Sequence, residues 1–330
     1  MSVKFFTLDN IAKMDIKKKI IDVIVKNNTF LVTSHMNPDG DAVGSMGGMF
    51  YLLKTLGKDV HLYNTSEIPD RFSYLDIKDY VVHKLLRNKY DCIIFLDCGD
   101  KYRAGKEIDR LHVKVSINID HHPTNDNFAD INWVDATMSS VGEMIFYLIK
   151  EARVELTYNI SECLYTAIVS DTGSFTFSNT RPSTLKVVME ILENGFDLDD
   201  FNRKYQRYWT LNKVHLHGLA MQNAKLYFDG KLALTKISRE LFEKTNTTSE
   251  EAEGIINYLR QIKGVKVAAI LREDEDKVKV SMRSWGEVDV SKIAMELSGG
   301  GHKNAAGGSL DLPLDEAEEA FIKCVAGFIC

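Results

Sequence analysis

The chain has 330 residues, of which 45% are apolar, 27% are charged and only 5 are proline. At about 150 residues per domain these values predict two globular domains, and they exclude a disordered chain or a miniprotein. The formal net charge of -6 excludes a broad basic surface for long nucleic acid. We therefore expect any polyanionic ligand to be short.

The cysteine content and the N-terminal residues bear on the compartment. Five cysteines are an odd number, and none form a C-x-x-C pair, which predicts a reducing environment. The first residues, MSVKFFTLDNIAKMD, carry acids early and lack the basic start and apolar core of a secretory signal. No apolar run approaches the roughly 20 residues that span a bilayer. We expect a cytoplasmic protein without membrane contact.

The first half of the chain alternates apolar strands with helices. We predict strands at residues 29–34, 59–63, 90–96 and 113–119, and helices at residues 41–56, 140–152, 162–169 and 184–194. The second of these helices opens with a capping box, in which Ser140 precedes Glu143 by three positions. Continuous apolar strands separated by helices are typical of a parallel sheet with helices on both faces. The fold class is therefore α/β.

The second half changes character. We expect a helical segment at 201–225, a hairpin at 225–237 around Asp229-Gly230, a helix at 248–263, strands at 265–272 and 277–284, and a last helix at 315–328. This order predicts a smaller α+β domain. The predicted organisation is a first domain at 1–192, a helical linker at 193–215 and a second domain at 216–330, with a cleft between the domains.

Aspartates and histidines gather where the predicted strands end. His35, Asp39 and Asp41 follow the first strand, Asp97 follows the third, Asp120, His121 and His122 close the fourth, and Asp171 follows an apolar helix. A single aspartate at such a place is usually a turn former. Several together would repel one another unless a cation neutralised them. The pattern therefore predicts a site for more than one metal ion.

The ligand types indicate which metal and which chemistry. Carboxylates and imidazoles without thiolates favour Mn²⁺, with Mg²⁺ or Co²⁺ as alternatives, over structural zinc. Two neighbouring divalent cations are a standard device for in-line attack of activated water on phosphorus. The expected reaction is hydrolysis of a phosphoester or phosphoanhydride.

A glycine-rich segment in the second half is a candidate anion site. Five glycines, at 299, 300, 301, 307 and 308, surround His302 and Lys303. Glycine lets the backbone approach a ligand closely and offer its N–H groups to an anion. Taken alone, the segment is equally compatible with a flexible connection between a helix and a strand.

The motifs resemble a known family. His35-x-x-x-Asp39-x-Asp41-Ala42, Asp97, Asp120-His121-His122 and Asp171-Thr172-Gly173 are similar, in order, to the four motifs of the DHH phosphoesterases. Arg283-Ser284 and the run GGGHKNAAG at 299–307 resemble the DHH-associated substrate-binding domain. Together these motifs cover most of the chain, and they are most similar to the NrnA-like oligoribonuclease and pAp (3′-phosphoadenosine-5′-phosphate) phosphatase branch.

The resemblance implies a role for each motif residue. It implies that His35 and Asp39 bind one ion, that Asp41, His121 and Asp171 bind the other, and that Asp97 bridges both. It further implies that Asp120 supports the metal-binding histidine, and that His122 faces the scissile phosphate as an acid or as a charge stabiliser. The implied substrate-binding residues are Arg283, Ser284, Gly300, Gly301, His302, Lys303 and Asn304.

The expected activity is hydrolysis of short RNA to mononucleotides, with dephosphorylation of pAp to AMP as a second activity. Oligonucleotides of about 2–5 residues carry few phosphates and need no extended basic groove. Hydrolysis of cyclic di-AMP or pApA is an open alternative, and a non-enzymatic nucleotide sensor is another. A pyrophosphatase fits the second half less well, and a RecJ-type exonuclease would be expected to carry an additional nucleic-acid-binding module. A homodimer is compatible with the sequence.

Overall fold

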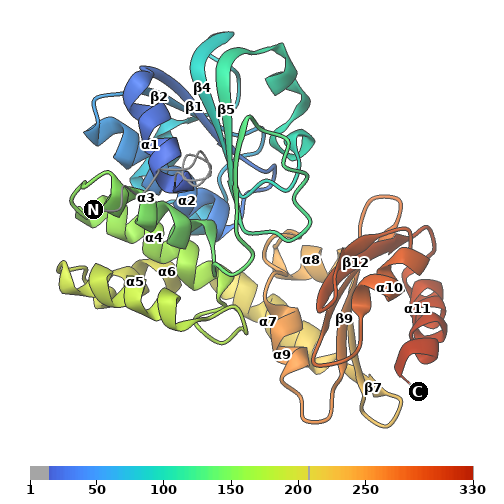
Figure 1. Cartoon of the computed structure of the whole chain (residues 1–330). Coiled ribbons are helices and arrows are strands. Elements are labelled where there is room, and N and C mark those ends of the chain that lie inside the picture. Colours follow the sequence, from blue (N-terminus) through green and yellow to red (C-terminus); the bar gives the residue numbers. More distant parts are fainter. Residues whose placement is uncertain (1–14, 207–208, 330) are drawn as a thin grey trace, which may run out of the picture. The chain divides into compact units, whose positions relative to one another are not determined.

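The computed structural model describes residues 15–206 and 209–329, except the side chain of His302. The chain divides into two compact units, residues 1–208 and 209–330 (Figure 1). None of the helices in the described ranges has the length and apolar character that crossing a bilayer requires.

The first unit contains a parallel six-stranded sheet in the order β3-β2-β1-β4-β5-β6. The strands are β1 (Thr29–Ser34), β2 (Asp59–Tyr63), β3 (Val81–Val82), β4 (Lys89–Leu96), β5 (His112–Asp120) and β6 (Ile131–Val134). The four predicted strands are confirmed. The edge strands β3 and β6 were not predicted, because two and four residues are too few for a periodic signal.

Layers of helix cover both faces of this sheet. The α-helices are α1 (Ile16–Lys26), α2 (Gly40–Thr55), α3 (Val141–Glu151), α4 (Tyr158–Asp171), α5 (Pro182–Glu193) and α6 (Leu198–Gln206). Side chains alternate between faces along β1, so Val32 joins the core beneath α2 and α3, whereas Leu31 joins a second core. That second core is closed by the short 3₁₀ helices η4 (Lys101–Ala104) and η5 (Lys106–Arg110).

The second unit contains a mixed six-stranded sheet in the order β11-β12-β10-β9-β8-β7. Its strands are β7 (Lys225–Tyr227), β8 (Leu232–Ile237), β9 (Val267–Glu273), β10 (Val278–Ser284), β11 (Gly300–His302) and β12 (Ala305–Leu310). Its helices are α7 (Leu211–Gln222), α8 (Arg239–Thr245), α9 (Ile255–Arg260), α10 (Val290–Glu296) and α11 (Leu314–Ile329). One apolar core includes residues of α10 and α11, and another includes residues of α7 and α9. The predicted hairpin and the antiparallel pair β9–β10 are confirmed.

Two local predictions were wrong in detail. The helix predicted at 248–263 is only Ile255–Arg260, because Glu251 accepts hydrogen bonds from the Thr248 amide and hydroxyl in a turn instead of opening a helix. In the capping box of α3, Ser140 caps the helix as expected. The Glu143 carboxylate, however, accepts from the amide and hydroxyl of Ser139 rather than from the Ser140 amide.

Helices α2 and α4 pack so closely that a glycine is required between them. A Cβ atom at Gly44 would lie 2.4 Å from the Cys163 carbonyl oxygen and 2.8 Å from the Ala167 amide nitrogen. Backbone cannot yield as a flexible side chain can, so Gly44→Ala should destabilise the protein by about 2–3 kcal/mol. Urea unfolding of the full chain measures this change.

The matched control for that variant is Gly218→Ala. Gly218 lies within α7 and has no atom within 4 Å of the added Cβ, so alanine there should stabilise the protein by about 0.5–1 kcal/mol. Equal free energies of unfolding for the two variants would contradict the close packing of α2 on α4.

Candidate metal centre

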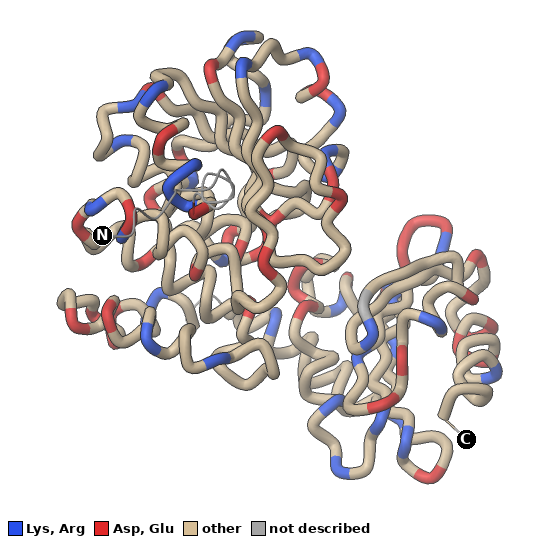
Figure 2. Tube along the Cα trace, viewed as in Figure 1, with Lys and Arg blue, Asp and Glu red and all other residues tan. Residues whose placement is uncertain are grey.

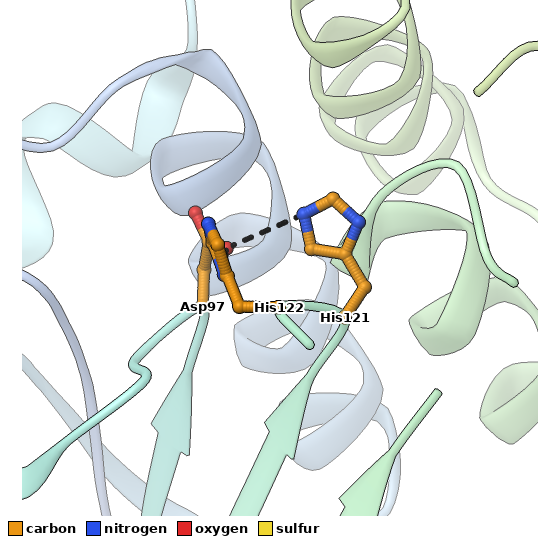
Figure 3. A group of neighbouring side chains, drawn as sticks. All are labelled: Asp97, His121 and His122. Atoms are coloured by element: carbon orange, nitrogen blue, oxygen red, sulfur yellow. Dashed lines mark ion pairs between the residues drawn. The ribbon is translucent and has the colours of Figure 1, made fainter. Parts of the chain in front are cut away.

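The carboxyl ends of three neighbouring strands bring the predicted residues together. Strands β1, β4 and β5 are parallel neighbours, so their ends lie at one edge of the sheet. His35 directly follows β1, Asp97 follows β4, and Asp120 ends β5 before His121 and His122. Figure 3 shows Asp97, His121 and His122 at the ends of adjacent strands, with their side chains turned toward one another. Open α/β sheets commonly build sites at this edge.

Three groups of three side chains that could hold a metal ion meet there. One is Asp97, His121 and His122, and the other two contain the predicted ligands. In the first group, His35 Nε2 lies 3.4 Å from Asp97 Oδ2 and 3.9 Å from Asp39 Oδ1. Ligands in octahedral coordination at about 2.1 Å from one ion are about 3 Å apart. The first group therefore needs only a small contraction to hold a divalent cation.

The second group, Asp41, His121 and Asp171, lies next to Asp97. His121 Nε2 lies 3.8 Å from Asp41 Oδ2 and 3.7 Å from Asp171 Oδ2. Asp97 Oδ1 lies 3.8 Å from the same nitrogen, while its Oδ2 faces His35. The two oxygens of Asp97 thus face different groups, as a bridging carboxylate requires.

The backbone and neighbouring groups hold the buried carboxylates in place. Asp97 is 2% exposed and has a φ of +56°, a left-handed conformation that aspartate tolerates better than most residues. Asp41, in the first turn of α2, accepts hydrogen bonds from Ser45 Oγ and from the amides of Val141 and Gly142. These amides begin α3, whose N-terminus favours negative charge.

Hydrogen bonds also orient the two imidazoles that face the carboxylates. His35 Nδ1 lies 2.8 Å from the Met36 carbonyl oxygen, and His121 Nδ1 lies 3.3 Å from the Met138 carbonyl oxygen. A carbonyl accepts only from a protonated nitrogen, so Nδ1 carries the proton and the Nε2 lone pair is directed at the carboxylates. Metal-ligating histidines are commonly oriented in this way.

The role expected for Asp120 needs correction. Its carboxylate lies 2.8 Å from Nδ1 of His122, and it contacts His121 only through that residue's main-chain amide. Asn125 Nδ2 donates to the same carboxylate. Asp120 therefore orients the ring of His122, whereas the ring of His121 is oriented by the Met138 carbonyl.

The electrostatics of this cluster favour a bound cation. Burial raises the pKa of Asp171 to about 6 and the pKa of Asp41 well above its usual value. Burial also opposes ionisation of Asp97, but the three neighbouring histidines outweigh it and hold its pKa at about 2. Asp97 Oδ1 is buried without a hydrogen bond. Such an oxygen amid buried carboxylates fits the donor set of a divalent cation.

Two neighbouring carboxylates favour the protonated form of His122. Burial lowers its pKa, but the hydrogen bond to Asp120 and the charge of Asp97 outweigh that effect and raise the pKa to about 9. The imidazolium is therefore the favoured form of His122 at neutral pH.

Sequence reasoning missed Asn179, which orients one of the proposed ligands. Its Nδ2 donates to Asp171 Oδ2, to the Asp171 carbonyl and to the Ser139 carbonyl at 2.9–3.1 Å. Removing a side chain that orients a metal ligand typically costs 10- to 100-fold in metal affinity. Asn179→Ala should weaken Mn²⁺ binding by about that factor, as measured by calorimetric titration.

Asn194→Ala is the matched control for this variant, because Asn194 Nδ2 donates only to the Glu190 carbonyl at an exposed helix end. We expect it to bind Mn²⁺ like the unmodified chain. If both variants bound Mn²⁺ with unchanged affinity, Asn179 would have no part in orienting Asp171.

The predicted substrate-binding residues gather at one end of the second sheet. Arg283 on β10 and His302 on β11 both pair in register with Ala305 on β12. Lys303 and Asn304 form the connection between β11 and β12. Gly301 has a φ of +145°, and its missing Cβ would lie 2.5 Å from Ala306 Cα. A side chain at Gly301 would therefore collide with β12, so glycine is needed for β11 to pair with β12.

Ser284 does not fit the direct contact expected of it. It is 1% exposed, and its hydroxyl donates to the Val288 carbonyl at 2.8 Å. Its amide donates to the Asn304 carbonyl. Ser284 therefore holds the neighbouring loop in place, while burial lowers the pKa of the adjacent Arg283 without removing its charge at neutral pH.

Comparison with known proteins identifies the family. A model described as the DHH family, N-terminal domain, matches residues 29–168, and a DHHA1 domain model matches residues 229–329. The bifunctional oligoribonuclease and PAP phosphatase NrnA of Bacillus subtilis is 31% identical over 306 residues, covering 92% of this chain and 95% of the relative. The chain belongs to the DHH family.

Other DHH relatives agree in length and architecture. The NrnA of Thermus thermophilus is 31% identical over 316 residues, covering 94% of this chain and 93% of the relative. The crystal structure of an exopolyphosphatase-related protein from Bacteroides fragilis superposes with a TM-score of 0.89 at 27% identity, covering 95% and 96% of the two chains. The crystal structure of exonuclease RecJ bound to manganese shares the fold. It superposes with a TM-score of 0.53 at 12% identity, covering 96% of this chain and 95% of the RecJ chain.

Proposed function

We propose that this DHH hydrolase cleaves short RNA oligonucleotides of about 2–5 residues to mononucleotides, and that it also removes the 3′-phosphate of pAp to give AMP. The observation that carries the proposal is that the group His35, Asp39 and Asp97 lies next to the group Asp41, His121 and Asp171, with the second oxygen of Asp97 facing His121. The relatives named as oligoribonuclease and PAP phosphatase, which match almost the whole chain, support the choice of substrate.

We assign the first group, His35, Asp39 and Asp97, to one divalent cation. Asp41, His121 and Asp171 are assigned to a second cation, with Asp97 between the two. Mn²⁺ is the proposed metal, since the donor set contains carboxylates and imidazoles without thiolates. Bound cations would activate water and neutralise the charge that develops on the phosphoryl oxygens.

His122 is assigned to the scissile phosphate. Asp120 fixes the ring through Nδ1, so Nε2 is the nitrogen that we assign to the substrate. An imidazolium there would stabilise negative charge on the phosphoryl group or protonate the departing ribose oxygen. In an oligonucleotide the 3′ ribose oxygen leaves, and the phosphoryl group stays on the released nucleotide as its 5′-phosphate. In pAp the same ribose oxygen leaves, the 3′-phosphoryl group goes to water as inorganic phosphate, and the 5′-phosphate stays on AMP.

In the second unit we assign Arg283, His302 and the backbone of Gly300 and Gly301 to nucleotide binding. Arginine matches phosphate oxygens in a bidentate arrangement. No side chain lies within 4 Å of a Cβ built at Gly300, so its backbone is open to an approaching ligand. Lys303 and Asn304 follow in the same turn and are assigned with them.

The distribution of charge supports a short substrate. Figure 2 shows acidic and basic residues interspersed along both units. Long nucleic acid is normally held by many basic contacts along its backbone. A two-nucleotide substrate would need only a few contacts near the metal centre.

The free cysteines support a reducing compartment, and we propose the cytoplasm. Cys92, Cys98 and Cys163 are buried as free thiols, and Cys324 is free and half-buried. Buried free thiols persist where disulfides are kept reduced.

A substrate panel tests the proposed function. The full chain with Mn²⁺ is incubated with RNA of increasing length from the dinucleotide upward, pAp, pApA and cyclic di-AMP, and the products are separated. We expect rapid hydrolysis of the shortest RNAs and release of AMP from pAp. Faster turnover of cyclic di-AMP or pApA than of dinucleotides would replace the proposal with the phosphodiesterase alternative. Binding without products from any substrate would favour a nucleotide sensor.

A further inference from the structure

The short helix η4 stands beside the metal centre with its backbone fixed on two sides. The carbonyl of Arg103 accepts a hydrogen bond from the amide of Met36, the residue that follows His35. The Asp100 carboxylate accepts from the amides of Tyr102 and Arg103 at 2.9 and 3.1 Å, and Ala104 is buried in the core. The chain therefore presents the side chains of η4 from a rigid base, directly after the loop of residues 97–100.

Two side chains of η4 are exposed to solvent. Tyr102 is 67% exposed. The Arg103 guanidinium is also exposed, and it makes no hydrogen bond or ion pair with any residue that the structure describes. By contrast, Lys101 in the same helix pairs with Asp109. An exposed ring and an unpaired guanidinium are therefore adjacent on a fixed segment.

The position of Arg103 relative to the metal centre is informative. Its carbonyl accepts a hydrogen bond of 2.7 Å from the amide of Met36, so its main chain adjoins the loop that carries His35. It nevertheless forms no ion pair with Asp97 or Asp120 among the described contacts. Arg103 is therefore anchored beside the loop that carries His35, and its exposed guanidinium stays outside the carboxylate cluster.

We propose that Tyr102 and Arg103 form a nucleotide subsite on the first unit, in which Arg103 binds a second phosphate of the substrate, next to the scissile one, and Tyr102 stacks on a base. The inference rests on the proposed function, because a neighbouring phosphate exists only in a substrate such as a short oligonucleotide or pAp. Guanidinium groups bind phosphate oxygens through paired, charge-assisted hydrogen bonds. Aromatic rings bind every base through its π-face.

The test compares substrates that differ only in the second phosphate. Hydrolysis of a diribonucleotide is measured with a 5′-terminal phosphate, with a 3′-terminal phosphate and with neither. The unmodified chain should favour one phosphorylated form, and Arg103→Ala should reduce that preference at least about 10-fold, chiefly through KM. Arg103→Lys should restore part of the preference. A preference that survives in Arg103→Ala, or its absence in the unmodified chain, would overturn the phosphate assignment.

The tyrosine is tested with a ring-preserving variant. Tyr102→Ala should raise KM for dinucleotides about 10-fold or more, whereas Tyr102→Phe should keep the original KM, since stacking needs the ring and not the hydroxyl. Equal effects of the two substitutions would refute stacking. Arg110→Ala is the matched control, because this exposed arginine lies at the amino end of β5, away from the carboxyl edge. It should leave KM unchanged.

Equilibrium binding separates failure of the subsite from failure of the proposed function. Calorimetric titration of the full chain with pAp and with adenosine 3′-phosphate needs no turnover. If no substrate is hydrolysed, the proposed function fails, but a 10-fold weaker binding of pAp to Arg103→Ala, larger than the change for adenosine 3′-phosphate, would still support the subsite. Equal weakening for both ligands, or none, would reject it.

Discussion

Asp97→Asn should abolish hydrolysis, with kcat/KM falling at least about 1,000-fold. Asparagine keeps the size of the side chain but removes the negative charge between the two groups of ligands. Two cations held close together repel each other unless an anion lies between them. Bound cations stabilise the charge of the transition state by several kcal/mol, and each 1.4 kcal/mol corresponds to about tenfold in rate. Steady-state hydrolysis of a diribonucleotide in Mn²⁺ measures the loss.

Metal stoichiometry shows whether Asp97 acts by bridging. The unmodified chain should bind two Mn²⁺ ions per chain in calorimetric or EPR titration, and Asp97→Asn should bind at most one with comparable affinity. Asp59→Asn is the matched control, since Asp59 is an exposed residue at the amino end of β2 that pairs with Arg87. Retention of more than a few per cent of activity by Asp97→Asn would contradict the bridging role.

The second large effect is expected at His122. His122→Ala should lower kcat about 10²- to 10⁴-fold, the usual contribution of a positioned acid or base. Two Mn²⁺ ions should still bind, because the ring of His122 is oriented by Asp120 and is not among the proposed ligands. Loss of one ion in His122→Ala would instead make His122 a ligand, as its proximity to Asp97 and His121 allows.

A substrate with a better leaving group separates the two roles of His122. A p-nitrophenyl ester of a nucleotide releases a stable anion that needs no proton. If His122 acts as an acid, His122→Ala should hydrolyse this ester almost as fast as the unmodified chain does. If His122 stabilises phosphoryl charge, the loss should be as large as with the dinucleotide. Asp120→Asn should show a smaller loss in the same direction, because it only orients the ring.

The proposed metal ligands could be predicted because their signals are local. His35, Asp97 and Asp120 each come directly after an apolar strand, and parallel strands place their carboxyl ends at one edge. The acids and histidines that directly follow the strands could therefore be predicted to meet at this edge of the sheet. The resemblance to a known family supplied the division into two groups, and the distances among the side chains are compatible with that division.

Other features depend on contacts between segments far apart in the chain. Asn179 lies in a loop after α4, and no local pattern indicates that its amide donates to Asp171 and Ser139. The partner of Asp120 was mistaken because the adjacent residues His121 and His122 present equal sequence signals, whereas the chain direction after β5 turns only one ring toward the carboxylate. The resemblance implied that Ser284 binds substrate, but the structure buries it and its hydroxyl donates to the Val288 carbonyl.

By itself, the sequence determined the strand order along the chain, the apolar cores and the set of acids and imidazoles that gather at the sheet edge. Only the tertiary structure decided which nitrogen of each histidine faces the carboxylates, which side chains support them, and that Arg103 stands unpaired beside them. The physical reason is that strand formation and burial follow from residue periodicity over a few positions. Hydrogen-bond partners, in contrast, depend on which segments far apart in the sequence the fold brings into contact.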